Sequence, residues 1–209
     1  MSALFKALAA LAGIGTASAG AYFAIPSKKG VSIRERLEKA GYSILNLDKR
    51  DTSHKGEWDK IKEAYGKETT ELLRFSGVVQ GTDYTISGIK DSCFSLLSSE
   101  SKKDEDLEKA RRWCVVPVTV ESRLGDKLAL LDTSGTNDAN LWTEKLKEHQ
   151  KDNSQFPKIP NAWGSGDDND TKKTTALKTK CGSMAKLHTF DKDFETFVSY
   201  TIDWCTKPK

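Results

Sequence analysis

"RRWCVV", residues 111 to 116, decides the fold, because its Trp-Cys pair returns as Trp204-Cys205 near the end of the chain. Trp and Cys are rare here, with five and four copies among 209 residues. Chance placement gives roughly a tenth of one such pair in a chain of this composition. Two pairs therefore indicate an internal repeat whose copies both end on Trp-Cys.

Further landmarks recur in the same order upstream of each pair. Residues 41–58, GYSILNLDKRDTSHKGEW, match residues 125–142, GDKLALLDTSGTNDANLW, at a constant offset of 84, with Gly, Leu-Asp and Trp in corresponding positions. Cys93 corresponds to Cys181 at an offset of 88. The sequence therefore predicts a tandem duplication of a unit of roughly 85 residues. Its two repeats are expected at 31–117 and 118–209.

Each repeat is predicted to be mainly α-helical, and some of the segments that connect its helices can form short strands. Ser32 and Thr119 stand where they can cap a first short helix. The apolar runs YSILNLD and KLALLD come next, and a short strand or an extended connection fits either of them. A second helix is expected to open at Trp58 and at Trp142, because the apolar residues after Trp58 share one helical face.

Two more helices complete each predicted repeat. In the first repeat, the third helix carries Cys93 and the fourth runs from about Asp104 to Cys114, while an extension of the second helix over residues 70–75 also fits. In the second repeat, FDKDFETFVSYTIDWC at residues 190–205 places aromatic and apolar side chains along one helical stripe. Such a stripe indicates core packing rather than a cofactor site.

The helices give the cysteines a predicted connectivity. If the third and fourth helices form an antiparallel hairpin, the start of one lies beside the end of the other. This pairs Cys93 with Cys114 and Cys181 with Cys205 as disulfides, each adding about 3 kcal/mol of stability. Four reduced, buried cysteines remain an alternative. A zinc site is not expected, because the chain has no Cys-x-x-Cys pair.

Residues 1–30 differ in composition from the rest of the chain. Lys6 is the one charge in residues 1–25, and the run from Ala7 to Ile25 is uncharged. As a helix this run reaches roughly 28 Å, close to the hydrocarbon thickness of a bilayer. The segment also resembles a signal peptide with a small-x-small cleavage pattern at residues 17–19. We favour a retained N-terminal transmembrane helix over a cleaved signal.

Two observations disagree on the side of the membrane that holds the body. Lys28, Lys29, Arg34 and Arg36 follow the apolar run, and the positive-inside rule would keep the body in the cytoplasm. Disulfides, in contrast, persist in oxidising exteriors. We give the cysteines more weight and expect a single-span protein of the cell membrane with an extracellular body.

The composition excludes some classes of function. Hydrophobic residues make up 37% and charged residues 30% of the chain, which does not fit a polytopic membrane protein. The 33 basic and 30 acidic side chains are interleaved, and the net charge is +3. Nucleic-acid binding needs a concentrated positive surface. No nucleic-acid partner is therefore expected.

No catalytic, cofactor-binding or metal-binding residue is predicted, and the chain is not expected to be an enzyme. His54, His149 and His188 lack the His-Glu-x-x-His spacing, and each is expected to be an exposed polar residue. Residues 164–173, GSGDDNDTKK, lack the glycine and the distant glutamate of a calcium loop, so a loop with a helix N-cap is expected. Neither a phosphate-binding loop nor a Gly-x-Ser-x-Gly elbow occurs.

Four features of the chain carry a resemblance to a known group of proteins. They are an N-terminal apolar segment, the stretch RLEKAGYSILNLD at residues 36–48, a helix led by Trp, and a closing Trp-Cys pair. Over nearly the whole chain they resemble paralogous families of uncharacterised membrane-associated and surface proteins of haemotrophic mycoplasmas. The resemblance implies a surface protein of a wall-less bacterium, with a part in antigenic variation or in contact with host red cells. Its loose motifs assign no functional residues.

These observations favour a membrane-anchored, surface-exposed helical repeat protein. Its expected partners are the lipid bilayer, through the N-terminal helix, and a host protein or cell-surface component. The alternatives are a cytoplasm-facing membrane scaffold, a protein secreted after signal cleavage, and a hydrolase built from dispersed acidic groups. The redox state of the four cysteines separates the exterior location from the cytoplasmic one.

Overall fold

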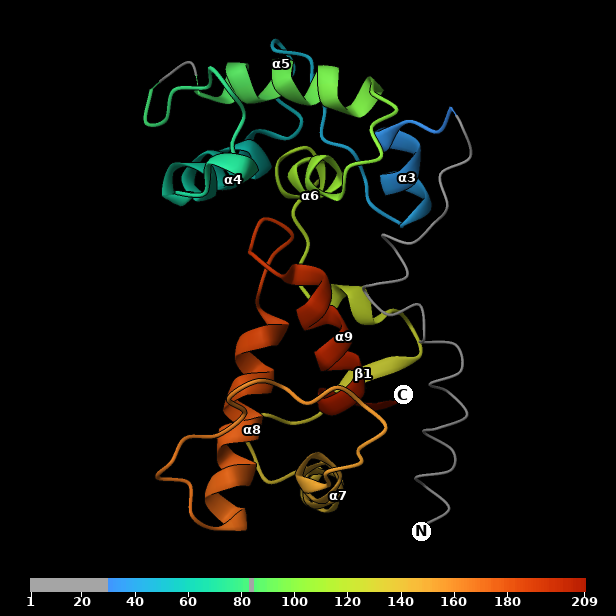
Figure 1. The fold of residues 1–209 in the computed structure, drawn as a ribbon, viewed down its shortest axis with the longest axis vertical. Helices are drawn as coiled ribbons and strands as arrows, with labels where there is room; N and C mark the ends of the chain where they lie inside the picture. Colours follow the sequence, from blue (N-terminus) through green and yellow to red (C-terminus); the bar gives the residue numbers. More distant parts are fainter. Residues whose placement is uncertain (1–29, 83–84) are drawn as a thin grey trace. The chain divides into compact units, whose positions relative to one another are not determined.

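The computed structural model describes residues 30–82 and 85–209 (Figure 1). These residues are mainly helical, as the sequence predicts. The predicted membrane anchor at residues 1–30 lies outside the described residues, apart from Gly30. Within the two described ranges, no helix combines the length and the apolar character that crossing a membrane requires.

The described chain forms two compact units. The first unit comprises the described part of Tyr22–Val118 together with His188–Lys192, and the second comprises Thr119–Leu187 and Asp193–Lys209. The change of unit after Val118 falls one residue beyond the end that the sequence predicts for the first repeat. The repeat pattern does not predict that His188–Lys192 lies with the first unit.

The first unit is built from short helices joined by irregular segments. α5 packs against α6, and α3 contacts both (Figure 1). Figure 1 shows α6 nearly end-on beneath α5, so these two helices cross at a large angle and the predicted antiparallel arrangement is wrong for this unit. The elements are α3 (Ile33–Lys39), α4 (Lys55–Lys67), the 3-10 helix η1 (Glu71–Leu73), α5 (Thr85–Ser98) and α6 (Asp104–Trp113).

The second unit has three α-helices and a small sheet among its described residues. α8 packs against both α7 and α9 (Figure 1). The elements are the 3-10 helix η2 (Glu121–Leu124), β1 (Leu128–Leu130), α7 (Ala139–Gln150), α8 (Asp170–Ala185), α9 (Phe194–Cys205) and β2 (Thr206–Pro208).

The short strands differ between the units. β1 pairs with β2 in antiparallel register, with Leu128 opposite Pro208 and Leu130 opposite Thr206. The matching apolar run of the first unit forms a single bridge, between Ile44 and Val115. The sequence fits either a short strand or an extended connection at these runs. The second unit forms the strand, and the first unit forms the extended connection with a single bridge.

Capping residues act where the sequence predicts them. The Ser32 hydroxyl accepts a hydrogen bond from the Glu35 N–H at 3.2 Å and opens α3. The Thr119 hydroxyl accepts from the Ser122 N–H at 3.2 Å, but a four-residue 3-10 helix follows instead of the predicted α-helix. Asn169 caps α8 by accepting from the Lys172 N–H at 3.0 Å, which confirms the loop and N-cap predicted for residues 164–173.

The predicted extension of the second helix over residues 70–75 is wrong. α4 ends at Lys67, and the Gln80 side-chain amide donates to the backbone carbonyls of Tyr65 at 2.7 Å and Glu68 at 3.0 Å. These carbonyls are therefore satisfied without a further helical turn. The Thr70 N–H donates to the Glu68 carboxylate at 2.8 Å, and the chain turns away into η1.

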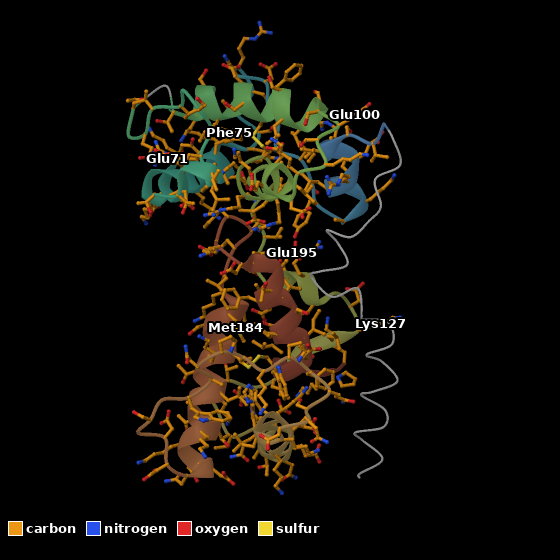
Figure 2. The ribbon with its side chains drawn as sticks, in the orientation of Figure 1. Glu71, Phe75, Glu100, Lys127, Met184 and Glu195 are labelled. Carbon is orange, nitrogen blue, oxygen red and sulfur yellow. A yellow bond between two sulfur atoms is a disulfide. The ribbon has the colours of Figure 1, made fainter. Side chains whose placement is uncertain are left out.

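The core of the second unit collects aromatic and aliphatic side chains around its disulfide (Figure 2). The predicted stripe on the last helix supplies Trp204 to this core, and Phe194 of the same stripe is also fully buried. This confirms that the stripe packs inside the protein. The core residues are Leu131, Trp142, Ile159, Ala162, Leu177, Cys181, Met184, Trp204 and Cys205.

Candidate functional site

Two buried disulfides hold the ends of the last helices. Cys93 is bonded to Cys114 with Cα atoms 5.5 Å apart, and Cys181 to Cys205 with Cα atoms 5.6 Å apart. Both appear as yellow bonds inside the two units (Figure 2). The predicted connectivity is thus confirmed, although each bridge reaches the interior of the preceding helix rather than its start.

The Trp beside each bridge is anchored through its indole nitrogen. Trp113 Nε1 donates to the backbone carbonyl of Leu73 at 2.6 Å, and Trp204 Nε1 donates to that of Pro157 at 2.8 Å. Both indoles are fully buried. A buried indole N–H needs such a partner, since leaving it unpaired is costly. The Trp-Cys pair therefore fixes the last helix to another helix through the disulfide, and through the indole to η1 in the first unit and to a loop in the second.

A backbone hydrogen bond repeats the same pattern. The Leu45 N–H donates to the Cys114 carbonyl at 3.0 Å, and the Leu131 N–H donates to the Cys205 carbonyl at 2.8 Å. The segment before the second helix is thereby held against the Trp-Cys corner in each unit.

The Trp that lies on the second helix also has matching partners. Trp58 Nε1 donates to the Asn46 carbonyl at 3.1 Å, and Trp142 Nε1 donates to the Asp132 carbonyl at 2.8 Å. Both helices begin three residues before the Trp, at Lys55 and Ala139 rather than at the predicted position.

A lysine ammonium lies near each of these indoles. Lys90 Nζ is 5.4 Å from the Trp58 ring centroid, and Lys178 Nζ is 5.8 Å from that of Trp142. Both distances fall within the range of cation–π attraction. The two lysines stand 88 positions apart, the same offset as Cys93 and Cys181.

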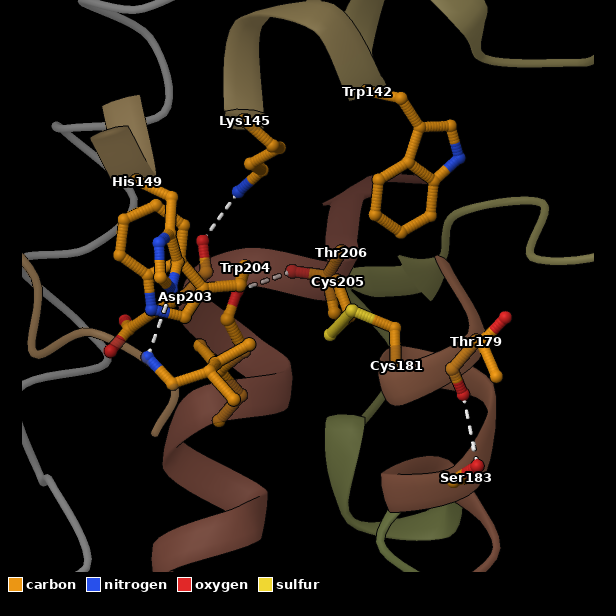
Figure 3. The surroundings of a disulfide bond; sticks show 12 residues. Trp142, Lys145, His149, Thr179, Cys181, Ser183, Asp203, Trp204, Cys205 and Thr206 are labelled. Carbon is orange, nitrogen blue, oxygen red and sulfur yellow. Dashed lines mark hydrogen bonds between the residues drawn. A yellow bond between two sulfur atoms is a disulfide. The ribbon is translucent and has the colours of Figure 1, made fainter. Parts of the chain in front are cut away.

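The second unit buries charged side chains at positions where the first unit has apolar side chains or side chains of a different charge (Figure 3). Lys145 lies on α7, 84 positions after the buried Ile61, and its ammonium donates to the backbone carbonyl of Asp203. Burial lowers the pKa of Lys145 to about 8, although nearby carboxylates oppose the shift. Burial raises the pKa of the Asp203 carboxyl to about 6, against the attraction of Lys145.

His149 lies in the same region, and the prediction that it is exposed is wrong. Its side chain is 4% exposed, and its ring contacts those of Trp163 and Trp204 at centroid distances of 4.9 and 4.6 Å. Nε2 accepts from the Ile159 N–H at 3.0 Å, which places the proton of the neutral ring on Nδ1. Burial lowers the pKa of His149, and Lys158 adds to this shift. The imidazole is therefore a neutral core group.

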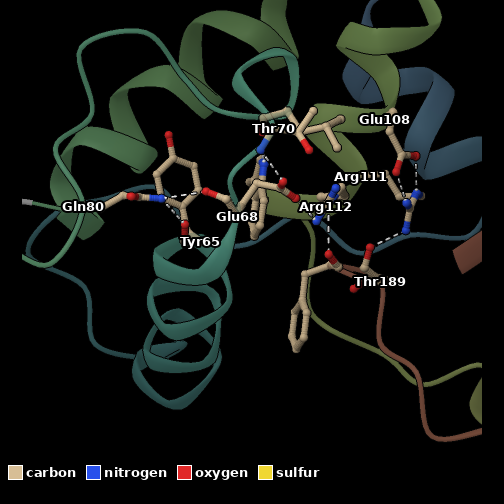
Figure 4. Close-up of polar contacts among 11 residues, drawn as sticks. Tyr65, Glu68, Thr70, Gln80, Glu108, Arg111, Arg112 and Thr189 are labelled. Carbon is tan, nitrogen blue, oxygen red and sulfur yellow. Dashed lines mark hydrogen bonds and ion pairs between the residues drawn. The ribbon is translucent and has the colours of Figure 1, made fainter. Parts of the chain in front are cut away.

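In the first unit, the two arginines of the opening stretch hold His188–Lys192 (Figure 4). Arg111 donates to the backbone carbonyl of Thr189 and forms an ion pair with Glu108. Arg112 Nε donates to the backbone carbonyl of Phe190 at 2.9 Å. Both guanidinium groups are at least 95% buried. The segment thus joins the first unit through its backbone.

Arg112 also forms an ion pair with the nearly buried carboxylate of Glu68, at 2.5 Å. Burial raises the pKa of Glu68, but hydrogen bonds from Thr70 and the charge of Arg112 outweigh this effect, and the pKa is lowered overall. Arg112 Nη1 has no hydrogen-bond partner among the described residues. This ion pair lines a hollow of about 430 Å³ that Lys60, Lys192 and other residues complete.

A larger hollow of about 570 Å³ lies in the second unit, between the loop at residues 161–167 and one face of α8. Trp163 and Asp167 line it from the loop, and hydroxyl side chains line it from the helix. Sequence reasoning missed this hollow, because its residues lie in a polar loop and on the exposed side of a helix.

The remaining histidines are placed separately. His54 Nδ1 accepts from the Asn46 N–H at 2.9 Å, and the His188 ring stacks on that of Phe190 at 5.0 Å between centroids. Both are half-buried rather than exposed. Across residues 30–82 and 85–209, no group of three or more His, Cys, Asp or Glu side chains could hold a metal ion.

Comparisons of the chain with protein-family models, with curated proteins and with solved structures give no match.

Proposed function

We propose that the chain is a membrane-anchored binding module whose disulfide-bonded body faces the exterior of the cell. The observation that carries this proposal is the pair of fully buried disulfides. Disulfides of this kind belong to oxidising compartments and are rare in the cytosol. The uncharged run from Ala7 to Ile25 would supply the anchor.

We also propose that the body is a tandem duplication at residues 31–117 and 118–209. Its support is the agreement between contacts in the two units, since disulfides, indole hydrogen bonds and lysine–indole contacts recur at offsets of 84 to 91. Contacts of three kinds in the same order are hard to explain by separate origins.

Binding rather than catalysis is the proposed activity. The two groups with large pKa shifts already have structural partners, since Lys145 donates to a backbone carbonyl and attracts the Asp203 carboxylate. A structural polar pair explains such shifts without a reaction. The resemblance to surface proteins of haemotrophic mycoplasmas makes a host protein or cell-surface component the proposed partner.

The test is carried out on cells that produce the full chain. Intact cells are treated with a membrane-impermeant amine reagent, and a cytoplasmic protein of the same cells is the control. Lysines of the body should be labelled while the control stays unlabelled. Peptides mapped without reductant should contain the two disulfides within their own units.

Other outcomes select the alternatives. If all four thiols alkylate before reduction and the body resists labelling, the cytoplasm-facing scaffold replaces this proposal. If a soluble chain that begins at Gly20 is recovered from the medium, the segment is a cleaved signal and the protein is secreted.

A further inference from the structure

We propose that the hollow beside α8 in the second unit binds a neutral oligosaccharide. The hollow has a volume of about 570 Å³, within the range of small-molecule sites. It combines an aromatic ring, a row of hydroxyl groups and charged side chains of both signs. The class of ligand follows from what each of these groups offers.

Trp163 provides a rigid apolar surface. Its ring contacts that of the buried His149, with centroids 4.9 Å apart and planes at 60°. His149 is itself fixed by the Ile159 N–H at 3.0 Å. The indole remains half-exposed and lines the hollow. The Lys173 ammonium lies over this ring, 5.8 Å from its centroid, so the exposed remainder of the indole is what can contact a ligand that has apolar C–H faces and polar edges.

The helix lines the hollow with four hydroxyl groups, three of which already donate their hydrogen to the helix backbone. Thr171, Thr175, Thr179 and Ser183 are spaced four residues apart, and all four are exposed. Thr175 donates to the Thr171 carbonyl at 3.0 Å, Thr179 to the Thr175 carbonyl at 3.0 Å and Ser183 to the Thr179 carbonyl at 2.9 Å. Since these three hydroxyl hydrogens are committed to the helix, the oxygens offer lone pairs. The ligand facing them must carry donors.

The charged groups make the lining a mixed one. Lys172 and Lys180 can donate, and Asp167 can accept while one of its oxygens already receives the Gly164 N–H at 2.7 Å. Two lysines against one aspartate do not form the concentrated positive surface that a polyanion requires. The row from Thr171 to Ser183 is roughly 18 Å long, which suits an elongated ligand. Sugar hydroxyls both donate and accept, and a chain of sugars matches this length.

The first unit offers a natural comparison. The positions that correspond to Trp163 and Thr179, at offsets of 84 and 88, are Val79 and Asp91. Neither can supply the aromatic surface or the neutral acceptor. We therefore assign the site to the second unit alone, which makes the first unit an internal control.

This inference deepens the proposed binding function and rests on it only for its biological setting. The test uses the purified, oxidised full chain in a zwitterionic detergent, because sugar-headed detergents would compete. Lacto-N-neotetraose is the neutral probe, and a heparin hexasaccharide is the polyanionic one. Binding is measured by saturation-transfer NMR and by chemical-shift changes of the protein amides.

The neutral tetrasaccharide is expected to bind with a dissociation constant on the order of 1 mM. Amide shifts should fall in residues 161–183. Thr179→Val, which keeps the shape and removes the acceptor, should weaken binding at least about five-fold, and Trp163→Ala at least about ten-fold. The control Ser87→Ala on α5 should leave the dissociation constant unchanged.

Three results would overturn the inference. These are an absence of saturation up to about 10 mM tetrasaccharide, tighter binding of the heparin hexasaccharide than of the tetrasaccharide, or a Thr179→Val variant that binds like the parent. The labelling of intact cells reads out location alone, so the two proposals can fail separately. The amide spectrum of Thr179→Val, compared with that of the parent, checks that the variant is folded.

Discussion

Tyr65 in the first unit and His149 in the second accept equivalent backbone hydrogen bonds. The Tyr65 hydroxyl accepts from the Phe75 N–H at 2.7 Å, and His149 Nε2 accepts from the Ile159 N–H at 3.0 Å, ten residues later in both cases. Each ring also contacts the Trp of the Trp-Cys pair, with centroids 5.0 Å apart in the first unit and 4.6 Å apart in the second. The position therefore requires a flat ring with an acceptor at its edge. Only the imidazole makes this contact sensitive to mild acid.

His149→Tyr should remove a pH-dependent part of the stability. Because burial lowers the pKa of His149 below 6.5, the stability it contributes is present above pH 6.5 and is lost as the pH falls below that value. Protonation would also turn Nε2 into a donor facing the Ile159 N–H. The parent should therefore lose stability relative to the variant between about pH 7 and pH 5.

Urea unfolding of parent and variant at several pH values measures this difference. Asp203 has the opposite effect, since its raised pKa of about 6 gives stability that is present below pH 3.8 and lost as the pH rises through 6. Both proteins contain Asp203, so the difference between them isolates His149. The control Tyr65→Phe should leave the pH dependence as it is in the parent. A constant difference across this pH range would show that His149 does not titrate differently on folding.

Lys145→Met should stabilise the second unit near neutral pH. Lys145 is 8% exposed, and burial of its charge lowers its pKa from 10.5 to about 8. Because burial disfavours the Lys145 charge even with the attraction of Asp203 included, an apolar side chain of similar length should be stabilising, here by about 1 to 2 kcal/mol after the lost hydrogen bond and the lost attraction to Asp203 are subtracted. Ile61 already fills the corresponding position of the first unit.

The gain from Lys145→Met should shrink in alkali. A lowered lysine pKa gives stability that is present above pH 10.5 and is lost as the pH falls through 8, so the parent recovers as the pH rises. Chemical unfolding at about pH 7 and pH 9.5 measures both values. Lys147→Met, on the exposed side of α7, is the control and should show no such trend. A variant less stable than the parent at pH 7 would mean that the ion attraction to Asp203 outweighs burial.

Sequence reasoning identified the disulfides because they depend on order along the chain. Two repeated Trp-Cys pairs and two further cysteines leave one connectivity that keeps each bridge within its own unit. The burial of His149 was missed, because histidine in a charged stretch is usually exposed. Its alignment with Tyr65 at the offset of 84 was the available signal.

Other features leave no pattern in the sequence. Arg111 and Arg112 hold His188–Lys192 through the carbonyls of Thr189 and Phe190, and every residue has a carbonyl. The crossing of α5 and α6 also could not be predicted, because Cys93 in the middle of α5 fits either geometry. Such features depend on packing in three dimensions rather than on residue type.

Trp113→Phe and Trp204→Phe should each weaken one unit. Phenylalanine keeps most of the buried ring but removes the N–H, which leaves the carbonyl of Leu73 or Pro157 without its donor. The expected loss is about 1 to 3 kcal/mol in the free energy of unfolding of the affected unit. Hydrogen exchange resolved by peptide measures it, because amides of the other unit should keep their protection. The half-exposed Trp163, changed to Phe, should cost less than about 1 kcal/mol.

Replacing Cys181 and Cys205 together by Ser should destabilise the second unit alone. The bridge closes a loop across a sequence separation of 24, and its removal should cost about 2 to 5 kcal/mol, largely by freeing the unfolded chain. The matched double replacement of Cys93 and Cys114, with a separation of 21, should do the same to the first unit. Since each bridge lies within one unit, the two losses should add when all four cysteines are replaced. Peptide-resolved hydrogen exchange under oxidising conditions gives both values. Protection lost equally in both units after either replacement would show that the units unfold as one, and that a bridge within one unit also stabilises the other.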